Sequence, residues 1–327
     1  MTKIALLTTG GTIDGISKDR LDLSNYRSGK ATHSILDQVP EASSLAEIHH
    51  EPFDHISSRD MTPRHWDLIR ERIHHYVHNQ GFDGVVVTHG TNTMEETAYF
   101  LHLTCQTDKP IVLVGSQRPP GGMSSDAHLN LFNSVKLAAS PDAKGRGVLV
   151  MLNDEINSAR DVTKTNTYRT EAFQSGQMGF LGYVDVDGKA CFYRHPTKRH
   201  TVQSTFASLQ TDSLKRVDII FSYGGADGEL IRSLLHTDCK GIVIAGTGAG
   251  ICTTAEYEAL QEAREKGIQV VRSSRVGNGR VVPIAQYESD QFIAGDNLIP
   301  QKARILLMLA LEITDSPKAI QQIFNEY

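Results

Sequence analysis

Cysteine and tryptophan are scarce in the 327-residue chain, which has four of the first and one of the second. The cysteines are widely separated and show no CxxC spacing, so the sequence indicates neither a structural zinc site nor a redox pair. His74, His75 and His78 have a spacing that suggests metal ligands, but the apolar stripe of the same helix predicts that they face solvent. No metal is expected. Reduced thiols are expected at Cys105, Cys191, Cys239 and Cys252.

Long apolar runs and an excess of positive charge are also absent. The chain begins with MTKIALLTTGG, whose apolar run is too short for a signal peptide or a membrane span, so we expect a cytoplasmic protein. The net charge of −5 and the pI near 6.3 provide no attraction for a phosphate backbone. We therefore expect a small-molecule partner and no binding to nucleic acids or membranes.

The sequence does contain a series of short runs rich in valine, isoleucine and leucine. They lack polar alternation, which is typical of strands buried on both faces of a parallel sheet. Segments with helical periodicity lie between them, and this alternation predicts an α/β fold. We expect a larger N-terminal domain with a doubly wound, mostly parallel sheet and a smaller C-terminal α/β domain. The runs are residues 3–9, 84–90, 109–115, 147–152, 217–225, 241–248 and 268–274.

The character of the chain changes near residue 183, where a hairpin-like DVDGK is followed by polar residues without a clear period. We interpret residues 1–190 as the N-terminal domain, 191–213 as a linker and 214–327 as the C-terminal domain. The hydrophobic content of 39% and the charged content of 22% are those of a folded protein, so extended disorder is not expected.

Glycine and threonine directly follow several of the predicted strands. TTGGTIDG places Thr12 after a glycine pair, where the backbone can turn sharply and approach a ligand. The dinucleotide-binding GxGxxG spacing is absent, and so is a P-loop with its lysine. Taken alone, the motif fits a tight structural turn equally well. Sites in open α/β sheets form beyond the carboxyl ends of the strands, and this motif lies there.

Two further stretches combine hydroxyl groups with an amide or a lysine. THGTNTMEET, residues 88–97, places Thr91 and Asn92 where a strand gives way to a helix that Asn92 or Thr93 can cap. DVTKTNT, residues 161–167, places Lys164 among three threonines. A lysine desolvated among hydroxyls can lose its proton and act as a base, whereas an exposed lysine cannot. Taken alone, a solvated lysine is the simpler interpretation.

In combination, TGGTI, HGTNTMEETAYF and DVTKTN, in this order on an alternating scaffold, are much more specific. The chain resembles the bacterial L-asparaginase family from residue 3 to Tyr327, including SNYRSGK, VVRSSR and IQQIFNEY. Members of this family are homotetrameric threonine amidohydrolases that release ammonia from asparagine and, in some cases, glutamine. The resemblance implies a homotetramer of intimate dimers, in which a neighbouring subunit completes each active site.

The resemblance also implies roles for individual residues. Thr12 matches the nucleophile of the family, and Tyr26 matches the tyrosine that is hydrogen-bonded to it. Thr91 and Lys164 match the second catalytic threonine and its lysine. Ser58 matches a serine that holds the carboxylate of the substrate.

The chemistry of amide hydrolysis agrees with these roles. The reaction needs a nucleophile, a proton carrier for the leaving amine, and donors for the developing oxyanion. The two threonine pairs can provide the first two. Backbone N–H groups at Gly11 and Gly90, which are expected to be substrate-binding residues, can provide the third. An acyl-enzyme on threonine divides one hard step into two, and no metal or cofactor is required.

Three positions differ from the pattern of the family. The family usually has an aspartate at Asn92, a glutamine at Arg59 and an acidic residue at Gln286, the last aligned across a loop. In the family these residues surround the α-amino group of asparagine, so the local charge rises by about three units if all three alignments hold. An ammonium is then disfavoured, whereas an arginine suits an anionic or neutral substituent. All three are expected to bind substrate, and Asn92, beside Thr91 and Lys164, is also expected to be a catalytic residue.

Three functions therefore remain open from the sequence. The first is ordinary hydrolysis of L-asparagine to L-aspartate, with compensating carboxylates elsewhere. The second is the same chemistry on an amide whose α-nitrogen is absent, acylated or otherwise modified. The third is a non-catalytic amino-acid or amide sensor, which the presence of both threonine pairs argues against. A subunit of a tRNA-dependent amidotransferase is disfavoured, because the acidic charge balance offers nothing for tRNA.

Overall fold

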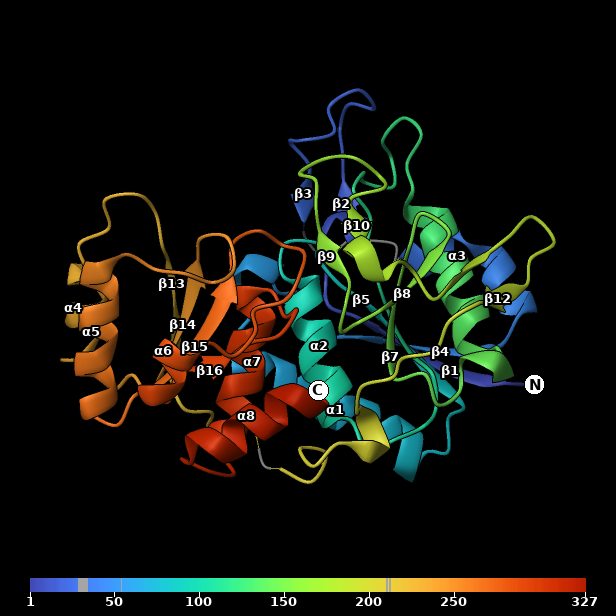
Figure 1. Ribbon diagram of the computed structural model, residues 1–327. Coiled ribbons are helices and arrows are strands. Elements are labelled where there is room, and N and C mark those ends of the chain that lie inside the picture. The colour runs from blue at the N-terminus through green and yellow to red at the C-terminus, as the bar shows by residue number, and fades with distance from the viewer. Residues whose placement is uncertain (29–34, 54, 210, 212) are drawn as a thin grey trace. The chain divides into compact units, whose positions relative to one another are not determined.

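The computed structural model describes residues 1–28, 35–53, 55–209, 211 and 213–327 (Figure 1). The chain divides into two compact units, Met1–Leu209 and Gln210–Tyr327. Each unit has its own sheet and its own hydrophobic core. A larger α/β unit followed by a smaller one is the fold that the sequence predicts. The finer bounds at residues 190, 191, 213 and 214 stay a prediction.

An eight-stranded sheet forms the first unit, in the order β12-β11-β8-β7-β6-β5-β1-β4. The pairs from β4 to β7 are parallel, and those from β7 to β12 are antiparallel. The turn between β11 and β12 contains the DVDGK stretch. The strands are β1 Lys3–Thr8, β4 Glu47–Pro52, β5 Gly84–Thr88, β6 Ile111–Val114, β7 Val148–Leu152, β8 Glu155–Ser158, β11 Gly182–Val184 and β12 Ala190–Phe192.

The central strands are buried on both faces, which explains their unbroken apolar runs. Leu6 of β1 and Val86 of β5 belong to a core shared with α3. The adjacent Leu7 and Val87 are also fully buried. Because neighbouring side chains of a strand point to opposite faces, both faces of the sheet are covered. The helices of this unit are α1 Pro63–His74, α2 Met94–Thr104 and α3 Ala127–Ala138.

The carboxyl ends of β1, β5 and β6 lie level with one another. Thr8 ends β1 and is paired with Thr88, the last residue of β5. Thr88 is paired in turn with Val114, the last residue of β6. The three segments that follow these strands therefore leave the sheet at one edge, where ligand sites of doubly wound folds form.

Two short antiparallel pairs lie outside the main sheet. β2 Gly15–Ile16 pairs with β3 Arg27–Ser28, and β9 Thr163–Lys164 pairs with β10 Phe173–Gln174. The remaining elements are short helical turns, namely η1 Thr12–Asp14, η2 Ile35–Gln38, η3 Pro40–Ser44, η4 Ser58–Asp60, η5 His75–Asn79, η6 Pro141–Ala143, η7 Gly176–Met178 and η8 Thr201–Gln203.

A four-stranded parallel sheet, in the order β13-β14-β15-β16, forms the second unit. Thr253 and Glu256 form a reciprocal capping box at the start of α5, with hydrogen bonds of 3.0 and 3.1 Å. Across the described parts of both units, no helix has the length and apolarity needed to cross a membrane. The elements are β13 Val217–Phe221, β14 Gly241–Gly246, β15 Gln269–Ser274, β16 Ile293–Ala294, α4 Glu229–Leu234, α5 Thr254–Glu265, α6 Ala285–Ser289, α7 Pro300–Leu311 and α8 Pro317–Glu326.

Candidate active site

The turns that follow β1 and β5 touch each other through glycine. Gly11 has a φ of +97°, and a Cβ placed on it would lie 2.4 Å from the Cα of Gly90. A Cβ on Gly90 would lie 2.5 Å from the Oγ of Ser58. Such close approaches of backbone require glycine. Thr12 and Thr91 each directly follow one of the touching glycines, so the fold brings the two threonines to the same edge.

Thr12 opens the turn η1, and its hydroxyl meets a tyrosine. The Oγ1 of Thr12 lies 2.6 Å from the hydroxyl oxygen of Tyr26, so the two groups share a hydrogen bond. Gly15 makes room for the ring, because a Cβ there would lie 2.8 Å from the Cδ2 of Tyr26. Thr12 is buried and Tyr26 is half-buried. The pair has the geometry of a hydroxyl nucleophile with a hydrogen-bonding partner.

Asp14 is a buried carboxyl group that ties this turn to β5. It accepts hydrogen bonds from the backbone N–H of Gly10 and from the Oγ1 of Thr88, the latter at 3.4 Å. Burial raises the pKa of Asp14, while nearby His55 and the two hydrogen bonds act in the opposite direction. The position of Thr12 therefore depends on a side chain that contacts the neighbouring strand.

The second pair consists of Lys164 and Thr91. The Nζ of Lys164 donates a hydrogen bond to the Oγ1 of Thr91 at 2.8 Å. Lys164 is half-buried, and this burial lowers its pKa, while the nearby carboxylate of Glu95 acts in the opposite direction. Burial thus increases the fraction of the amine that is neutral and free to accept a proton, and the geometry lets it exchange a proton with the hydroxyl of Thr91.

His89 is fully buried between β5 and Gly90. Its Nδ1 lies 2.7 Å from the carbonyl oxygen of Gly90, and its Nε2 lies 2.9 Å from the Oγ1 of Thr97. A carbonyl oxygen can only accept, so Nδ1 carries the proton and Nε2 accepts from the hydroxyl of Thr97. The neutral ring thereby links the turn that carries Thr91 to α2.

Buried histidines make this fold sensitive to acid. Burial lowers the pKa of His74, His89 and His200 to about 4, from an ordinary value of 6.5. The unfolded chain therefore binds more protons, and the stability of the neutral rings, present above about pH 6.5, is lost as the pH falls toward 4. We expect the free energy of unfolding to fall across this window, by about 3 kcal/mol for fully buried His89. Urea unfolding at a series of pH values measures this.

The matched variant for this prediction is His89→Gln, which keeps hydrogen-bonding groups but cannot titrate near neutral pH. Its unfolding free energy is expected to depend less on pH between 6.5 and 4 than that of the wild type. Equal slopes for the two proteins would show that His89 does not contribute to the acid sensitivity.

Ser58 brings its neighbour Arg59 close to the backbone of Asn92. Its Oγ accepts a hydrogen bond from the backbone N–H of Asn92 at 3.3 Å, and its carbonyl oxygen accepts one from the Oγ1 of Thr93 at 2.5 Å. Thr93 is the N-cap residue of α2, but its side chain makes no cap hydrogen bond. Arg59 and Asn92 are exposed, and the Nε of Arg59 lies 3.5 Å from the Oδ2 of Asp60.

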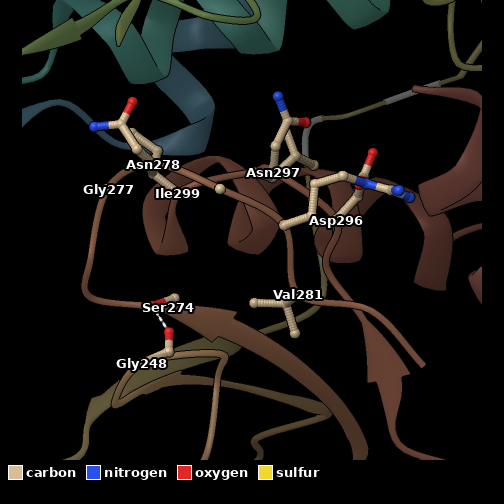
Figure 2. Close-up of a pocket in the computed structure, with 11 residues that line it drawn as sticks. Gly248, Ser274, Gly277, Asn278, Val281, Asp296, Asn297 and Ile299 are labelled. Carbon is tan, nitrogen blue, oxygen red and sulfur yellow. Dashed lines mark hydrogen bonds and ion pairs between the residues drawn. The ribbon is translucent and has the colours of Figure 1, made fainter. Parts of the chain in front are cut away.

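Gln286 lies in the second unit, on α6, and is exposed. It is therefore not among the residues that the first unit brings together. A pocket in the second unit lies between the loop after β15 and the segment that follows β16, and Gln286 does not line it (Figure 2). Its walls are linked by the Oγ of Ser274, which donates to the carbonyl oxygen of Gly248 at 2.6 Å. The lining residues are Gly248, Ser274, 277–281 and 296–299.

Sequence reasoning did not identify Asp14, His89 or Glu95 as parts of this site. His89 directly precedes the GTNT motif and Asp14 lies two residues after TTGGT, so a polar residue close to a glycine-containing turn was the available signal. The contact of Glu95 with Lys164 joins residues far apart in the chain and has no sequence signal. Within the described residues, no three or more His, Cys, Asp or Glu side chains are grouped to hold a metal ion.

Known proteins share both the sequence and the fold of this chain. Residues 3–198 match the family model described as Asparaginase, N-terminal, and residues 216–324 match that of the Glutaminase/Asparaginase C-terminal domain. The chain is 43% identical to L-asparaginase 2 of Bacillus subtilis (strain 168), over 100% of this chain and 87% of that protein. It is 41% identical to the glutaminase-asparaginase of Pseudomonas fluorescens biotype A, over 100% of this chain and 91% of that protein.

A solved structure gives the same result. The crystal structure of a probable cytoplasmic L-asparaginase from Campylobacter jejuni matches with a TM-score of 0.96 and 43% identity, and 100% of each chain is covered. Both halves of the chain thus match the two parts of one family, at a level of identity that holds over the full length. The chain belongs to the bacterial L-asparaginase family and is an asparaginase-type amidohydrolase.

Proposed function

We propose that this enzyme hydrolyses the side-chain amide of a small substrate, most simply L-asparagine, to the acid and ammonia through a threonine acyl-enzyme. The observation that carries the proposal is that two threonines on turns in contact are each hydrogen-bonded to a second polar side chain. Thr12 is bonded to Tyr26 at 2.6 Å, and Thr91 is bonded to Lys164 at 2.8 Å. Relatives named L-asparaginase and glutaminase-asparaginase support the same substrate class.

In the proposed first step, the Oγ1 of Thr12 attacks the amide carbon, and its proton is relayed through the hydroxyl of Tyr26, which gives up its own proton to the amide nitrogen. Backbone N–H groups of the turns at Gly11 and Gly90 stabilise the oxyanion. The C–N bond then breaks, and the nitrogen, which has received this proton, leaves as ammonia. This leaves an ester on Thr12, with no change in oxidation state.

In the proposed second step, water attacks the ester carbonyl. Lys164, in its neutral form, removes a proton from water through the hydroxyl of Thr91, and the C–O bond to Thr12 breaks as the proton returns to Oγ1. The lowered pKa of Lys164 supports this role, because burial favours the neutral amine. The carboxylic acid product is released and Thr12 is regenerated.

A second candidate substrate class is favoured by Arg59 and Asn92. Position 92 has no carboxylate, and position 59 carries a cation that Asp60 offsets only in part, since both side chains are solvent-exposed. An α-ammonium group of the substrate would gain little stabilisation beside Arg59. A substrate whose α-nitrogen is acylated, absent or otherwise modified avoids repulsion from the arginine. We propose such an amide as the alternative substrate, with the same chemistry at Thr12.

An ammonia-release panel decides between the two substrate classes. It pairs L-asparagine, D-asparagine and L-glutamine with succinamate and N-substituted asparagines, and reports kcat/KM for each. If Arg59 and Asn92 determine the specificity, the kcat/KM of the double variant R59Q/N92D for L-asparagine is expected to rise relative to its kcat/KM for the N-substituted amide. The expected change in the ratio of kcat/KM is roughly 10- to 100-fold, or about 1.4 to 3 kcal/mol.

The control for this panel is Arg64→Gln, which removes an exposed arginine of α1 and is expected to leave the ratio unchanged. Wild-type turnover of L-asparagine with a low-millimolar or better KM and an ordinary kcat would exclude the modified substrate. Measurable binding of amides without any ammonia release would instead identify a sensor.

By the resemblance to the family, we also propose a homotetramer of intimate dimers, and we propose a cytoplasmic location because a solved relative is described as a probable cytoplasmic L-asparaginase. The proposed domains are residues 1–190 and 214–327, joined by a linker of residues 191–213. In such an assembly, Gln286 would be supplied to the site by a neighbouring subunit.

A further inference from the structure

Glu95 contacts the segment that carries the catalytic lysine. It lies in the first turn of α2, four residues after Thr91, and is 6% exposed. Its Oε2 accepts a hydrogen bond from the backbone N–H of Lys164 at 2.6 Å. The side chain of the same lysine donates to Thr91 at 2.8 Å. Two hydrogen bonds therefore join the same two chain segments, one through the backbone of Lys164 and one through its amine.

The strand that carries Lys164 is short. β9 consists only of Thr163 and Lys164, paired with a two-residue partner strand. The backbone N–H of Thr165 donates to Ala172 at 2.7 Å, whereas that of Lys164 donates to Glu95. A two-residue strand has few ladder hydrogen bonds, so a charge-assisted bond from α2 contributes a large part of its restraint.

We propose that Glu95 is a positioning residue of the Thr91–Lys164 pair, which fixes the backbone of Lys164 and places a negative charge beside its amine. This inference rests on the proposed function, because it assigns Glu95 a part in the proton transfer of that mechanism. The side chain of Glu95 thus acts in two ways, through its reach to the backbone of Lys164 and through its charge. The two effects can be removed one at a time.

The charge is expected to act on the protonation of the lysine. Burial lowers the pKa of Lys164, and the carboxylate of Glu95 raises it. Two ion pairs lie close to Lys164 in the sequence. Arg160 is bonded to Asp161 at 3.0 Å, and Glu171 lies 3.5 Å from Arg169. Removing the charge of Glu95 is therefore expected to increase the fraction of neutral lysine at a given pH.

Two variants separate the effects. Glu95→Gln keeps the length of the side chain and an oxygen acceptor but removes the charge. Glu95→Asp keeps the charge but shortens the reach to the backbone of Lys164 by one methylene. Glu96→Gln, on the adjacent residue of the same helical turn, is the control. The pH profile of kcat is measured for all three and for the wild type, and circular dichroism melting checks that each is folded.

Glu95→Gln replaces the charge-assisted hydrogen bond by a weaker neutral one, so we expect a smaller loss of plateau rate than for Glu95→Asp and an acidic limb that moves to lower pH. The acidic limb reports a base that must be unprotonated in the enzyme–substrate complex. At a pH on that limb, the rate relative to the plateau is expected to rise by roughly threefold to tenfold. For Glu95→Asp we expect the plateau to fall by about tenfold or more while the limb stays in place.

Coincident acidic limbs for Glu95→Gln and the wild type would overturn the role of the charge. A Glu95→Asp plateau rate equal to that of the wild type would overturn the role of the reach. The same holds if the Glu96→Gln control loses as much plateau rate as Glu95→Asp. If Glu95→Gln does not fold, the Glu95→Asp plateau still tests the positioning. A wild-type enzyme that releases no ammonia from any amide is a different result, because it contradicts the proposed function itself.

Discussion

Replacing Thr12 by valine is expected to lower kcat for ammonia release by about 10⁴-fold or more, because the proposed acyl-enzyme forms on its hydroxyl. Valine has nearly the same shape, so the turn η1 and its contact with β5 should persist. The lost group is the Oγ1 that lies 2.6 Å from Tyr26. Steady-state ammonia release gives the rate, and rapid acid quenching with mass spectrometry detects the acyl adduct of the wild type, which the variant should lack.

Thr12→Ser is the control, since it retains a hydroxyl at the same atom position and should keep measurable turnover and the adduct. Differential melting curves establish that both variants are folded. A Thr12→Val enzyme whose kcat stays within tenfold of the wild-type value, or that still forms the adduct, would indicate that another residue is the nucleophile. Thr91 would then be the first alternative, because its hydroxyl contacts Lys164.

The second large effect is expected for Gly11→Ala. A Cβ at this residue would lie 2.4 Å from the Cα and 2.5 Å from the N of Gly90, and backbone atoms cannot move aside as a flexible side chain can. The φ of +97° adds strain for any residue with a side chain. We expect a loss of about 2 to 5 kcal/mol in unfolding free energy. Because the two threonine turns must move apart, kcat should also fall by about 100-fold or more.

Gly145→Ala separates the two causes of this loss. Gly145 also has a positive φ, of +72°, but a Cβ there would meet no atom within 4 Å. This control carries the conformational strain without the clash, so a loss of only about 1 kcal/mol and an unchanged kcat are expected. Denaturant unfolding and steady-state kinetics on both variants make the comparison. Equal losses for the two would mean that the contact between Gly11 and Gly90 does not hold the site together.

The framework of the fold was predictable because its signals are local. The buried strand β5 contains three consecutive valines, and α2 begins where periodicity and acidic residues indicate. The family motifs also drew attention to Thr12 and Thr91, whose turns the structure brings into contact through Gly11 and Gly90.

The remainder of the candidate site depends on contacts between distant segments. Glu95 and Lys164 are 69 residues apart in the chain, and Asp14 and Thr88 are 74 apart. No periodicity or cap rule specifies such pairs, because they arise only when level strand ends bring separate turns together. The same applies to Thr93, a cap residue by sequence whose hydroxyl instead donates to the carbonyl oxygen of Ser58.

Local patterns also miss partial burial. The histidines of the helix that follows Thr62 were expected to face solvent, and His78 does. His74 is half-buried instead, and its Nε2 accepts a hydrogen bond from the backbone N–H of Gln106 at 3.0 Å. The helix also changes at His75 into the π-helical turn η5. The contact of His74 reflects packing against a segment 32 residues away.

Ser58 is held by hydrogen bonds that do not involve the side chains proposed to select the substrate. Its hydroxyl is engaged by the backbone of residue 92, and its carbonyl oxygen by Thr93. Neither bond uses the side chain of residue 59 or of residue 92. Exchanges at these two positions should therefore leave both hydrogen bonds in place, so the proposed substrate preference could change in evolution without rebuilding the docking of the turn. Within the family, lineages that inherit the two threonine pairs unchanged should diverge most readily at these two side chains.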